Sequence, residues 1–576
     1  MLFLLVVEIL AINIKTNKDI HGINVNEKEI FISQLADDTT LFINDEKSLE
    51  NVFIVLDKFH KCAGLKLNKN KTGSRNIDLS KYDIRTPDTI KYLGISISKQ
   101  LNDIEILNYK EKIVQIKNKL NMWKSRKLSI KGKITILRSQ IIPIILYTAA
   151  VLYTPQNIME EIDSLFFSFI WPYKKHHVKK KVLVQRIECG GLKMPDIASM
   201  IKACKLTWIK RLLTKENNFT HFAKLNCNIQ DFSKYFSHMS RTFIDPNPSI
   251  FYSQILDYWD ELRETNLSKM NVNDILNEKL CYNKNILFDN KPFTSTKLTS
   301  ERLKIIFDLL KPDLSFKRPS KLHTLTIMEY NQLISAIPRE WKSIIKSTKH
   351  NYQFKRKDDF NIRVGITEKH ILKIKCKDFY WHLVNKTYIA PTATIKWEEL
   401  YYYINFNWKN IFMLPYHTTS ETSLQSLQYK IINRYFPCKS FTSMWNQEHD
   451  DECTVCHTTE DLEHYFFNCV FVQSFWQHLF SWFYALTKCK FNLKAIDIIL
   501  GVMNETNDNL LNVLNYCILF AKGYIAKCKE NNIDCSFDIF LCKLKDRLLI
   551  EEYISHINCK SNEFASKWNI IMKELS

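Results

Sequence analysis

The chain has 576 residues, of which 45% are hydrophobic and 13% aromatic. That length exceeds what one core normally holds and predicts three or four domains, while the apolar content excludes an intrinsically disordered chain. Lysine and arginine number 81 against 61 acidic residues, a surplus that favours a polyanionic partner such as nucleic acid or an anionic membrane. Most of the 16 cysteines are scattered, so we expect a reducing compartment and no disulfide framework.

The chain opens with an apolar stretch, MLFLLVVEILAI, that at first resembles a secretory signal. It lacks a basic start, Glu8 interrupts it, and no clean cleavage site of small residues follows. We therefore predict an amphipathic helix here, and an unsecreted protein of the nucleus and cytoplasm. The other long apolar run, Ile141 to Tyr153, is too short to span a bilayer and contains a proline, so we predict no membrane segment.

Residues 31–44, FISQLADDTTLFIN, predict a β-hairpin. Apolar runs flank the adjacent carboxylates Asp37 and Asp38 and place both acids at the tip. Two neighbouring acids repel each other unless donors or cations neutralise them, so the pair either lies in water or binds a hard cation such as Mg²⁺. For the dipeptide alone, an ordinary aspartate-rich turn is the alternative, because aspartate is a common turn residue.

Two further motifs follow this hairpin: GLKLNKNKT at residues 64–72 and KYLGISIS at residues 91–98. With the Ala-Asp-Asp turn they resemble the palm of reverse transcriptases of non-LTR (LINE-type) retrotransposons. The N-terminal segment EILAINIKTNKDIHGI is similar to the helix that leads into the catalytic hairpin of that family. Three motifs in the same order are much more specific than any one of them.

The resemblance implies a role for individual residues of the predicted palm. Asp37 would be a magnesium ligand and Asp38 its supporting carboxylate. Lys71 would lie near the incoming nucleotide, and Tyr92 and Gly94 would belong to the primer grip.

Family members carry fingers and an earlier palm strand upstream, and that strand supplies a further metal-binding aspartate. Here only 30 residues precede Phe31, and none before Asp19 is an aspartate. Phosphoryl transfer by two metals requires carboxylates that bridge both ions. We therefore expect an N-terminally truncated enzyme that is catalytically incomplete as an isolated chain.

Residues 106–212 are predicted to be helical and basic, and they resemble the thumb of the same family. No acidic residue occurs between Lys112 and Met159, whereas solvated helix faces normally mix charges of both signs. Apolar residues at positions 130, 134, 137, 141 and 145 form a helical stripe with lysines between them. The nucleic-acid-binding candidates of this segment are Lys124, Arg126, Lys131 and Lys133.

A second basic cluster lies in WPYKKHHVKKKVLVQRIECGGLKMPD, which also resembles a family segment. Three interpretations are open: phosphate contact, nuclear localisation and a solvated loop. The family resemblance favours nucleic acid. The candidates are Lys174, Lys175, Lys179, Lys180 and Lys181, with Arg186 nearby.

Residues 213–380 carry little functional signal and resemble a divergent connector. Helices are predicted at Ile250 to Glu264 and Glu301 to Leu310, and two prolines in Lys311 to Ser320 predict a linker. Residues 381–576 are predicted to be mostly helical and aromatic, notably in 381–386, 397–412 and 424–438. Their tyrosines and tryptophans recur at helical spacing, so core packing is favoured over base stacking.

Cys453, Cys456, His464 and Cys469 form the spacing C-x2-C-x7-H-x4-C. Four thiol and imidazole donors can enclose Zn²⁺ tetrahedrally with no open position, so the predicted site is structural. Buried free thiols are the alternative. The surrounding sequence resembles the C-terminal knuckle of LINE-type reverse transcriptases, which in that family helps bind template RNA and target DNA. His457 directly follows Cys456, where ligation is geometrically awkward.

The predicted fold is α+β and mostly α. It comprises a partial palm with its hairpin in residues 1–105, a helical thumb in 106–212, a connector in 213–380 and a helical domain with a zinc knuckle (453–469) in 381–576. The predicted function is that of a fragment of an RNA-directed DNA polymerase that uses Mg²⁺ and structural Zn²⁺, with RNA template and DNA primer or target as partners and no membrane. The alternative is a non-catalytic RNA- or DNA-binding protein. A helical protein-binding scaffold is a third interpretation, and it requires the basic surplus to be incidental.

Overall fold

The computed structural model describes most of the chain. The described residues are 2–25, 28–35, 38–69, 72, 79–84, 87–100, 103–171, 176–214, 218–227, 232, 249–263, 270–281, 283, 285–295, 298, 303–322, 325–348, 352–356, 360–364, 367–444, 450–503 and 509–575. Two compact units can be distinguished: unit 1 is Met1–Gln115, Ile144–Met159 and Ile197–Leu383, and unit 2 is Ile116–Pro143, Glu160–Asp196 and Val384–Ser576. Both are discontinuous in sequence, so the four predicted domains stay a prediction.

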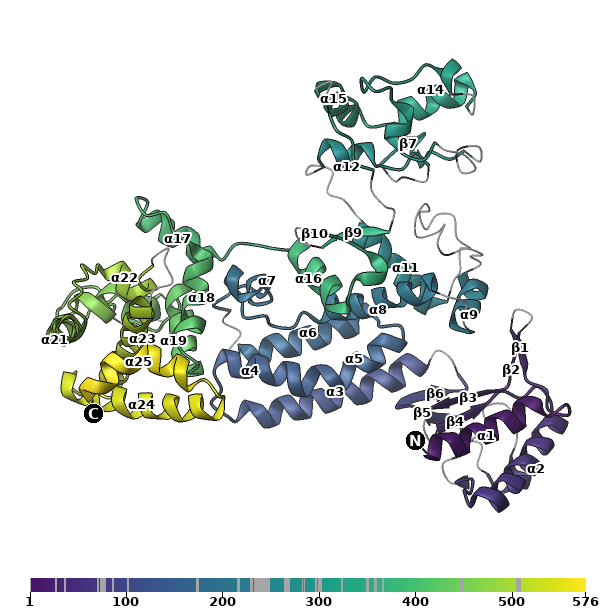
Figure 1. Cartoon of the computed structure of the whole chain (residues 1–576), viewed down its shortest axis with the longest axis horizontal. Helices are drawn as coiled ribbons and strands as arrows, with labels where there is room; N and C mark the ends of the chain where they lie inside the picture. The colour runs from purple at the N-terminus through teal and green to yellow at the C-terminus, as the bar shows by residue number, and fades with distance from the viewer. Residues whose placement is uncertain are drawn as a thin grey trace. The chain divides into compact units, whose positions relative to one another are not determined.

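The N-terminal part of unit 1 combines two helices with three antiparallel hairpins (Figure 1). The helices are α1 (Leu2–Thr16) and α2 (Glu46–Ala63), and the hairpins are β1–β2 (Ile23–Val25, Lys28–Ile30), β3–β4 (Ile32–Leu35, Asp38–Leu41) and β5–β6 (Thr89–Tyr92, Ile95–Ser98). The Asp45 side chain caps the start of α2, and Gly64 ends it with a left-handed φ of 70°. The predicted N-terminal helix and both predicted hairpins are confirmed.

The rest of unit 1 contains two separate apolar clusters. One gathers α8 (Ile197–Leu213), α9 (Asn218–Cys227), α11 (Ile250–Arg263) and α16 (Cys376–Lys386) around buried residues such as Trp259 and Phe379. The other joins α12 (Val272–Leu276), β7–β8 (Leu287–Phe288, Lys291–Pro292), α14 (Ile327–Ala336) and α15 (Arg339–Ser347) around Leu333 and Trp341. A further hairpin, β9–β10, pairs Asn361–Val364 with Thr367–His370.

Two predictions within residues 301–320 are wrong. In place of an α-helix, residues 303–310 hold the short 3₁₀ helix η7 (Ile306–Leu309) between isolated β-bridges. The predicted linker at residues 311–320 instead packs on the second cluster, because Leu314 is buried and Phe316 contacts it. The apolar partners of this segment lie far away in the sequence. Its prolines and polar residues therefore predicted a linker where the chain is in fact packed.

Three helical segments span residues 103–170: α3 (Asp103–Lys124), the continuous run of α4, η3 and α5 (Ile130–Ile136, Leu137–Ile141, Ile142–Val151) and α6 (Gln156–Ile170). The predicted apolar stripe is confirmed, since Ile134, Leu137, Ile141 and Ile145 are buried. The continuous helix Ile130–Val151 has 22 residues, and its most apolar 18 residues have a mean hydropathy of 1.6. It is long and apolar enough to cross a membrane. Core helices of globular proteins meet the same criterion, so the expectation of no membrane segment stays a prediction.

Unit 2 is built around a large buried cluster rich in aromatic side chains, among them Trp397, Phe466, Phe475 and Tyr516. Its C-terminal elements are α17 (Thr392–Leu400), α18 (Trp408–Thr418), α19 (Thr422–Ile432), α20 (Lys439–Ser443), η10 (His464–Asn468), α21 (Val470–Thr487), α22 (Ala495–Leu500), α23 (Asn509–Glu530), α24 (Phe537–Ile557) and α25 (Ser561–Leu575). The predicted helix 397–412 is interrupted, since residues 401–407 separate α17 from α18. Core packing is confirmed for buried side chains such as Trp397 and Tyr516, whereas Tyr402 and Tyr403 are exposed.

The fold class is therefore confirmed at its coarse level. Within the described residues, helices dominate, and the strands form five separate two-stranded sheets.

Candidate metal centre and basic surface

The predicted palm hairpin places Asp38 at its tip. Leu35 and Asp38 form the last residue pair of β3 and β4, and the Asp38 side chain is exposed. Asp37 and Lys71 lie outside the described residues. The hairpin and the place of Asp38 are confirmed, whereas magnesium binding and the role of Lys71 stay predictions.

The predicted primer-grip segment forms the tight hairpin β5–β6. Tyr92 pairs with Ile95, and the two turn residues Leu93 and Gly94 both have left-handed φ angles, of 47° and 77°. Two left-handed residues are typical of the turns that match the twist of paired strands. Tyr92 is half-buried and Gly94 is exposed. Contact of this turn with a primer stays a prediction.

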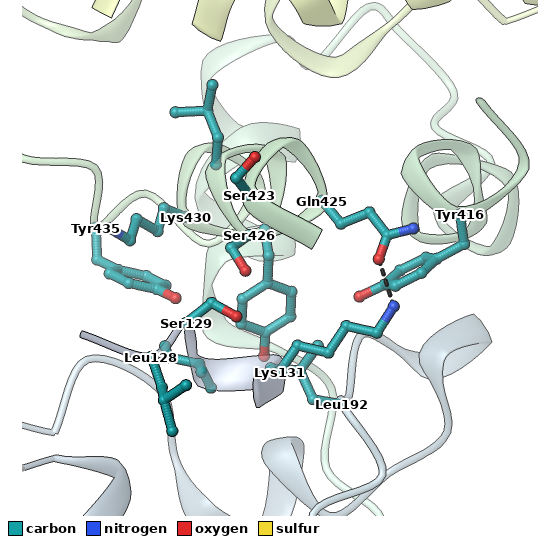
Figure 2. A pocket seen from close by; sticks show the side chains of 13 residues that line it. Leu128, Ser129, Lys131, Leu192, Tyr416, Ser423, Gln425, Ser426, Lys430 and Tyr435 are labelled. Atoms are coloured by element: carbon teal, nitrogen blue, oxygen red, sulfur yellow. Dashed lines mark hydrogen bonds between the residues drawn. The ribbon is translucent and has the colours of Figure 1, made fainter. Parts of the chain in front are cut away.

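The structure divides the basic candidates into exposed residues and residues bound to the protein itself. Lys131 donates a hydrogen bond to Gln425 Oε1 (Figure 2), and the Lys133 ammonium donates to the Ile170 carbonyl at 3.0 Å. Burial lowers the pKa of both lysines. The Lys180 ammonium lies 2.6 Å from Asp163 and 3.1 Å from Asp196, so two carboxylates already neutralise it.

Lys124, Arg126, Lys179 and Lys181 are exposed and remain available for phosphate contact. The Arg126 guanidinium lies 5.0 Å from the Trp123 ring centroid, a contact that leaves much of its polar edge free. Lys174 and Lys175 lie outside the described residues. We name the four exposed residues the basic set.

The four predicted zinc ligands come together in unit 2. One donor atom of each residue lies within 4.8 Å of the others, in the group Cys453, Cys456, His464 and Cys469. The Cys469 sulfur is 3.7 Å from that of Cys453 and 3.6 Å from that of Cys456. Tetrahedral Zn–S bonds of about 2.3 Å require sulfurs about 3.8 Å apart, whereas a disulfide requires about 2.0 Å. The donor set therefore fits a structural zinc ion.

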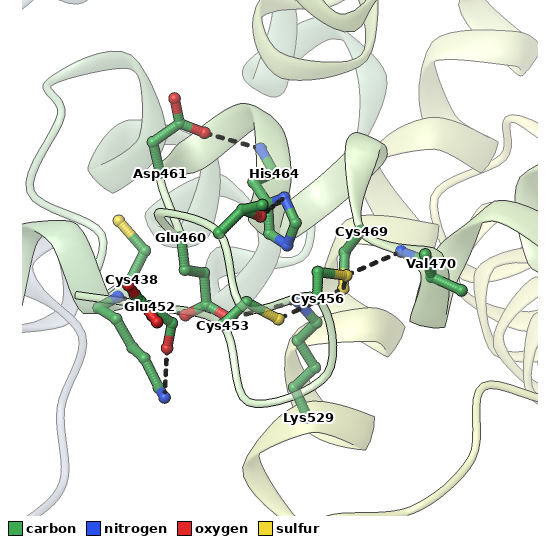
Figure 3. A network of polar contacts seen from close by, with 12 residues as sticks. Cys438, Glu452, Cys453, Cys456, Glu460, Asp461, His464, Cys469, Val470 and Lys529 are labelled. Carbon is green, nitrogen blue, oxygen red and sulfur yellow. Dashed lines mark hydrogen bonds and ion pairs between the residues drawn. The ribbon is translucent and has the colours of Figure 1, made fainter. Parts of the chain in front are cut away.

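A small turn presents the first two cysteines (Figure 3). Glu452 and Thr459 form a β-bridge, and the Cys453 N–H donates to the Thr458 carbonyl at 2.7 Å. His457 completes the turn with a left-handed φ of 52°, and its N–H donates to the Cys453 carbonyl at 2.9 Å. His457 is exposed and does not belong to the metal-binding group, as predicted.

The other two ligands flank the π-helical turn η10. The Cys469 N–H donates to the His464 carbonyl at 3.0 Å, which closes the turn between them. Nδ1 of His464 lies 3.4 Å from the Thr458 hydroxyl, while Nε2 is buried without a hydrogen-bond partner. A buried nitrogen without a partner is costly, and metal coordination at Nε2 would satisfy it, with Thr458 orienting the ring.

Electrostatics favours a thiolate at the first cysteine. Burial by itself would raise the pKa of the Cys453 thiol. Hydrogen bonds from the backbone N–H groups of Val455 and Cys456, together with His464 and Cys469, outweigh burial and lower the pKa to about 6. Burial raises the pKa of Cys469 to about 12. One thiol of the pair therefore ionises readily, and a second thiolate requires a cation beside it.

An ion pair that no sequence pattern indicated lies beside this site. The Lys529 ammonium lies 3.6 Å from a Glu460 oxygen and 4.2 Å from the Tyr465 ring centroid, and both charged side chains are nearly buried. Lys529 comes from α23, far from the knuckle in sequence, so no spacing pattern could have paired it with Glu460.

The four predicted zinc ligands thus come together, and the predicted hairpin forms in its described residues. Of the basic candidates that the structure describes, the basic set is exposed. The identity of the chain still depends on motifs in its own sequence. No family model matches it.

Proposed function

We propose that this chain is part of a reverse transcriptase of the non-LTR retrotransposon type, and that it binds RNA and DNA. The observation that carries the proposal is the closed Cys3His group, whose spacing and surrounding sequence resemble the family's C-terminal knuckle. The tip position of Asp38 and the tight turn at Leu93 and Gly94 are compatible with a palm. The bound ion would be zinc, and it would hold the surrounding helices together without taking part in chemistry.

Nucleic-acid contact is assigned to the basic set, Lys124, Arg126, Lys179 and Lys181. Phosphate contact by exposed cations is largely independent of sequence and releases counterions, so it weakens as salt concentration rises. Lys131, Lys133 and Lys180 are left out of this exposed surface because their side chains are half-buried. Lys180 is paired with carboxylates, whereas Lys131 and Lys133 bond to neutral groups.

A second candidate is a non-catalytic RNA- or DNA-binding protein. It is favoured by one observation: the four donors of the Cys3His group would fill a tetrahedral site, so the group suits a binding fold and not catalysis. Both candidates predict nucleic-acid binding, and only catalysis separates them.

The test measures binding of the full chain to single-stranded RNA and to a primer–template duplex between about 50 and 200 mM salt. Replacing the basic set by glutamine should flatten the plot of log affinity against log salt by up to about 0.9 for each lost duplex phosphate contact. The matched control replaces four other exposed lysines of unit 2, Lys396, Lys409, Lys488 and Lys490. An equal change in both variants would mean that net charge, not this surface, drives binding.

Template-dependent nucleotide incorporation with Mg²⁺ is measured on the same preparation. We expect binding without incorporation, because Asp37 and Asp38 alone do not complete a two-metal site. Incorporation that Asp38→Asn abolishes would favour the polymerase and exclude the non-catalytic candidate.

A further inference from the structure

A pocket of about 320 Å³ lies within unit 2, between segments that are far apart in sequence. The start of α4, the start and middle of α19 and the Tyr416 ring of α18 form its walls (Figure 2). Lys131 and Gln425, which bond to each other across it, are 294 residues apart. Its size is at the lower end of the roughly 300–1,000 Å³ typical of small-ligand sites.

The lining is mixed: leucine, isoleucine and tyrosine side chains form much of it, and its charged residues are lysines only. It includes Lys131, Lys430 and the hydroxyl groups of Ser129, Ser423 and Ser426, and no acidic residue lines it. Lys131 contacts Gln425 and the Tyr416 ring, whose centroid is 5.1 Å away, so its contacts within the described part of the chain are neutral. Burial lowers the pKa of Lys131. A half-buried cation surrounded by neutral groups favours the entry of an anion.

Tyr435 supplies an independent observation. Its side chain is only 5% exposed, yet its hydroxyl group has no hydrogen-bond partner. Trp171 and Tyr429 hold the ring, with centroids 5.9 and 6.3 Å away, and the hydroxyl points toward Ser426 and Ser129 in Figure 2. Leaving a buried hydroxyl without a partner is costly, so this group is placed as a donor for a ligand in the pocket.

We propose that this pocket binds the phosphate group of a nucleotide. Lys131 neutralises the charge, with Lys430 at the side, and the hydroxyls of Tyr435, Ser129 and Ser426 are the nearby donors. Charge-assisted hydrogen bonds of this kind are the strong ones. The volume exceeds that of a bare phosphate ion, which leaves room for part of the nucleoside. A free mononucleotide and a phosphate at the end of a strand share this chemistry.

The inference does not depend on the proposed polymerase origin, and its test uses small ligands. Calorimetric titration of the full chain compares 5′-AMP with adenosine and with inorganic phosphate. We expect AMP to bind, adenosine to bind at least about 10-fold more weakly, and phosphate to compete with AMP. Equal affinity for AMP and adenosine would overturn the proposal.

Tyr435→Phe is the most specific variant, because it removes one oxygen and keeps the ring. It should weaken AMP binding about 10-fold, while the free protein becomes no less stable, since the lost hydroxyl had no partner. Lys131→Met should weaken binding further, and Lys490→Met and Tyr484→Phe, at exposed positions outside the basic set, are the controls. Unchanged AMP affinity in both pocket variants would exclude the pocket as the binding site.

Oligonucleotides identify the source of the phosphate. If strands are the natural ligand, a 5′-phosphorylated oligonucleotide should bind more tightly than its 5′-hydroxyl form, and Tyr435→Phe should remove the difference. Neutralising the basic set should change the salt dependence of strand binding and leave AMP binding intact. The two measurements therefore separate a failure of the nucleotide pocket from a failure of the proposed nucleic-acid surface. No binding of AMP, phosphate or the phosphorylated strand at millimolar concentration would overturn this one.

Discussion

The Cys3His knuckle and the β3–β4 hairpin place their candidate functional side chains in contrasting ways. At the knuckle, four ligands from 17 consecutive positions converge within 4.8 Å, and two of them, Cys453 and Cys469, are buried. At the hairpin, Asp38 is exposed at the end of a two-stranded sheet and belongs to no metal-binding group of described residues. A closed metal site can be built from one short segment, whereas a catalytic carboxylate site requires acids from separate strands.

The buried cluster beneath the knuckle is also much larger than the one beneath the hairpin. The knuckle residues belong to the large aromatic cluster of unit 2, in which Phe466 and Val472 are fully buried. The hairpin lies on a cluster with four buried residues, Leu10, Ile14, Ile20 and Val52. We therefore expect substitutions at the knuckle to alter the fold and substitutions at the hairpin tip to alter function alone.

The largest effect is expected from removing a metal ligand. Cys469→Ser should abolish stoichiometric zinc and destabilise the knuckle by several kcal/mol, because metal binding supplies about 10–16 kcal/mol to structural zinc sites. Metal analysis and hydrogen exchange of residues 450–487 measure the two effects. The control is His457→Asn, beside Cys456 but outside the metal-binding group. Zinc retained after Cys469→Ser, or lost after His457→Asn, would refute the ligand assignment.

The knuckle was predictable because its information is local. The two-residue spacing places Cys453 and Cys456 on one turn, and the apolar runs that flank the Asp-Asp pair predict the hairpin. The partners of the lysines were not predictable: Lys131 bonds to Gln425, and Lys180 pairs with Asp163 and Asp196. These contacts depend on tertiary packing, and counting charges along the chain does not predict which segments pack together. The segment at Leu314 was misjudged for the same reason.

A cavity inside the knuckle should have the next largest effect. Phe466 lies between His464 and Cys469 with no exposed surface, and Phe466→Ala is expected to destabilise the region by about 3–5 kcal/mol. Zinc affinity should fall with it, since the turn that holds both ligands loosens. Val470→Ala, at a side chain that is 64% exposed, should change stability by less than about 0.5 kcal/mol. Equal effects of the two substitutions would show that this turn is not held by its core.

A pH dependence of stability should distinguish a buried lysine of unit 2 from an exposed one. Burial lowers the pKa of Lys522 to about 7, and its ammonium donates to Gln428 and to the Ile499 carbonyl. The unfolded lysine titrates near 10.4, so between these values the unfolded chain binds more protons and stability rises with pH. The slope approaches about 1.4 kcal/mol per pH unit above pH 7 and vanishes below it.

Hydrogen exchange of α23 between pH 7 and 8.5, corrected for intrinsic rates, measures this slope, which should contribute up to about 2 kcal/mol over that range. Lys522→Met should flatten it, whatever the absolute stability of the variant. Lys490→Met, at an exposed position, should leave the slope unchanged. A wild-type slope of zero would mean that Lys522 stays charged in the folded protein.

The smallest effect on stability is expected at the hairpin tip. Asp38→Asn removes one exposed charge and should change the local free energy of opening by less than about 0.5 kcal/mol. If the paired acids hold Mg²⁺, Fe²⁺ in its place should reduce added hydrogen peroxide to hydroxide and hydroxyl radical, which cleaves the backbone near residues 37–38. Asp38→Asn should suppress this cleavage while zinc content is unchanged. Absence of cleavage in the wild-type chain would remove the metal-binding role of the hairpin. A large loss of stability would contradict the contrast itself, because it would give Asp38 a structural role that its exposed position does not explain.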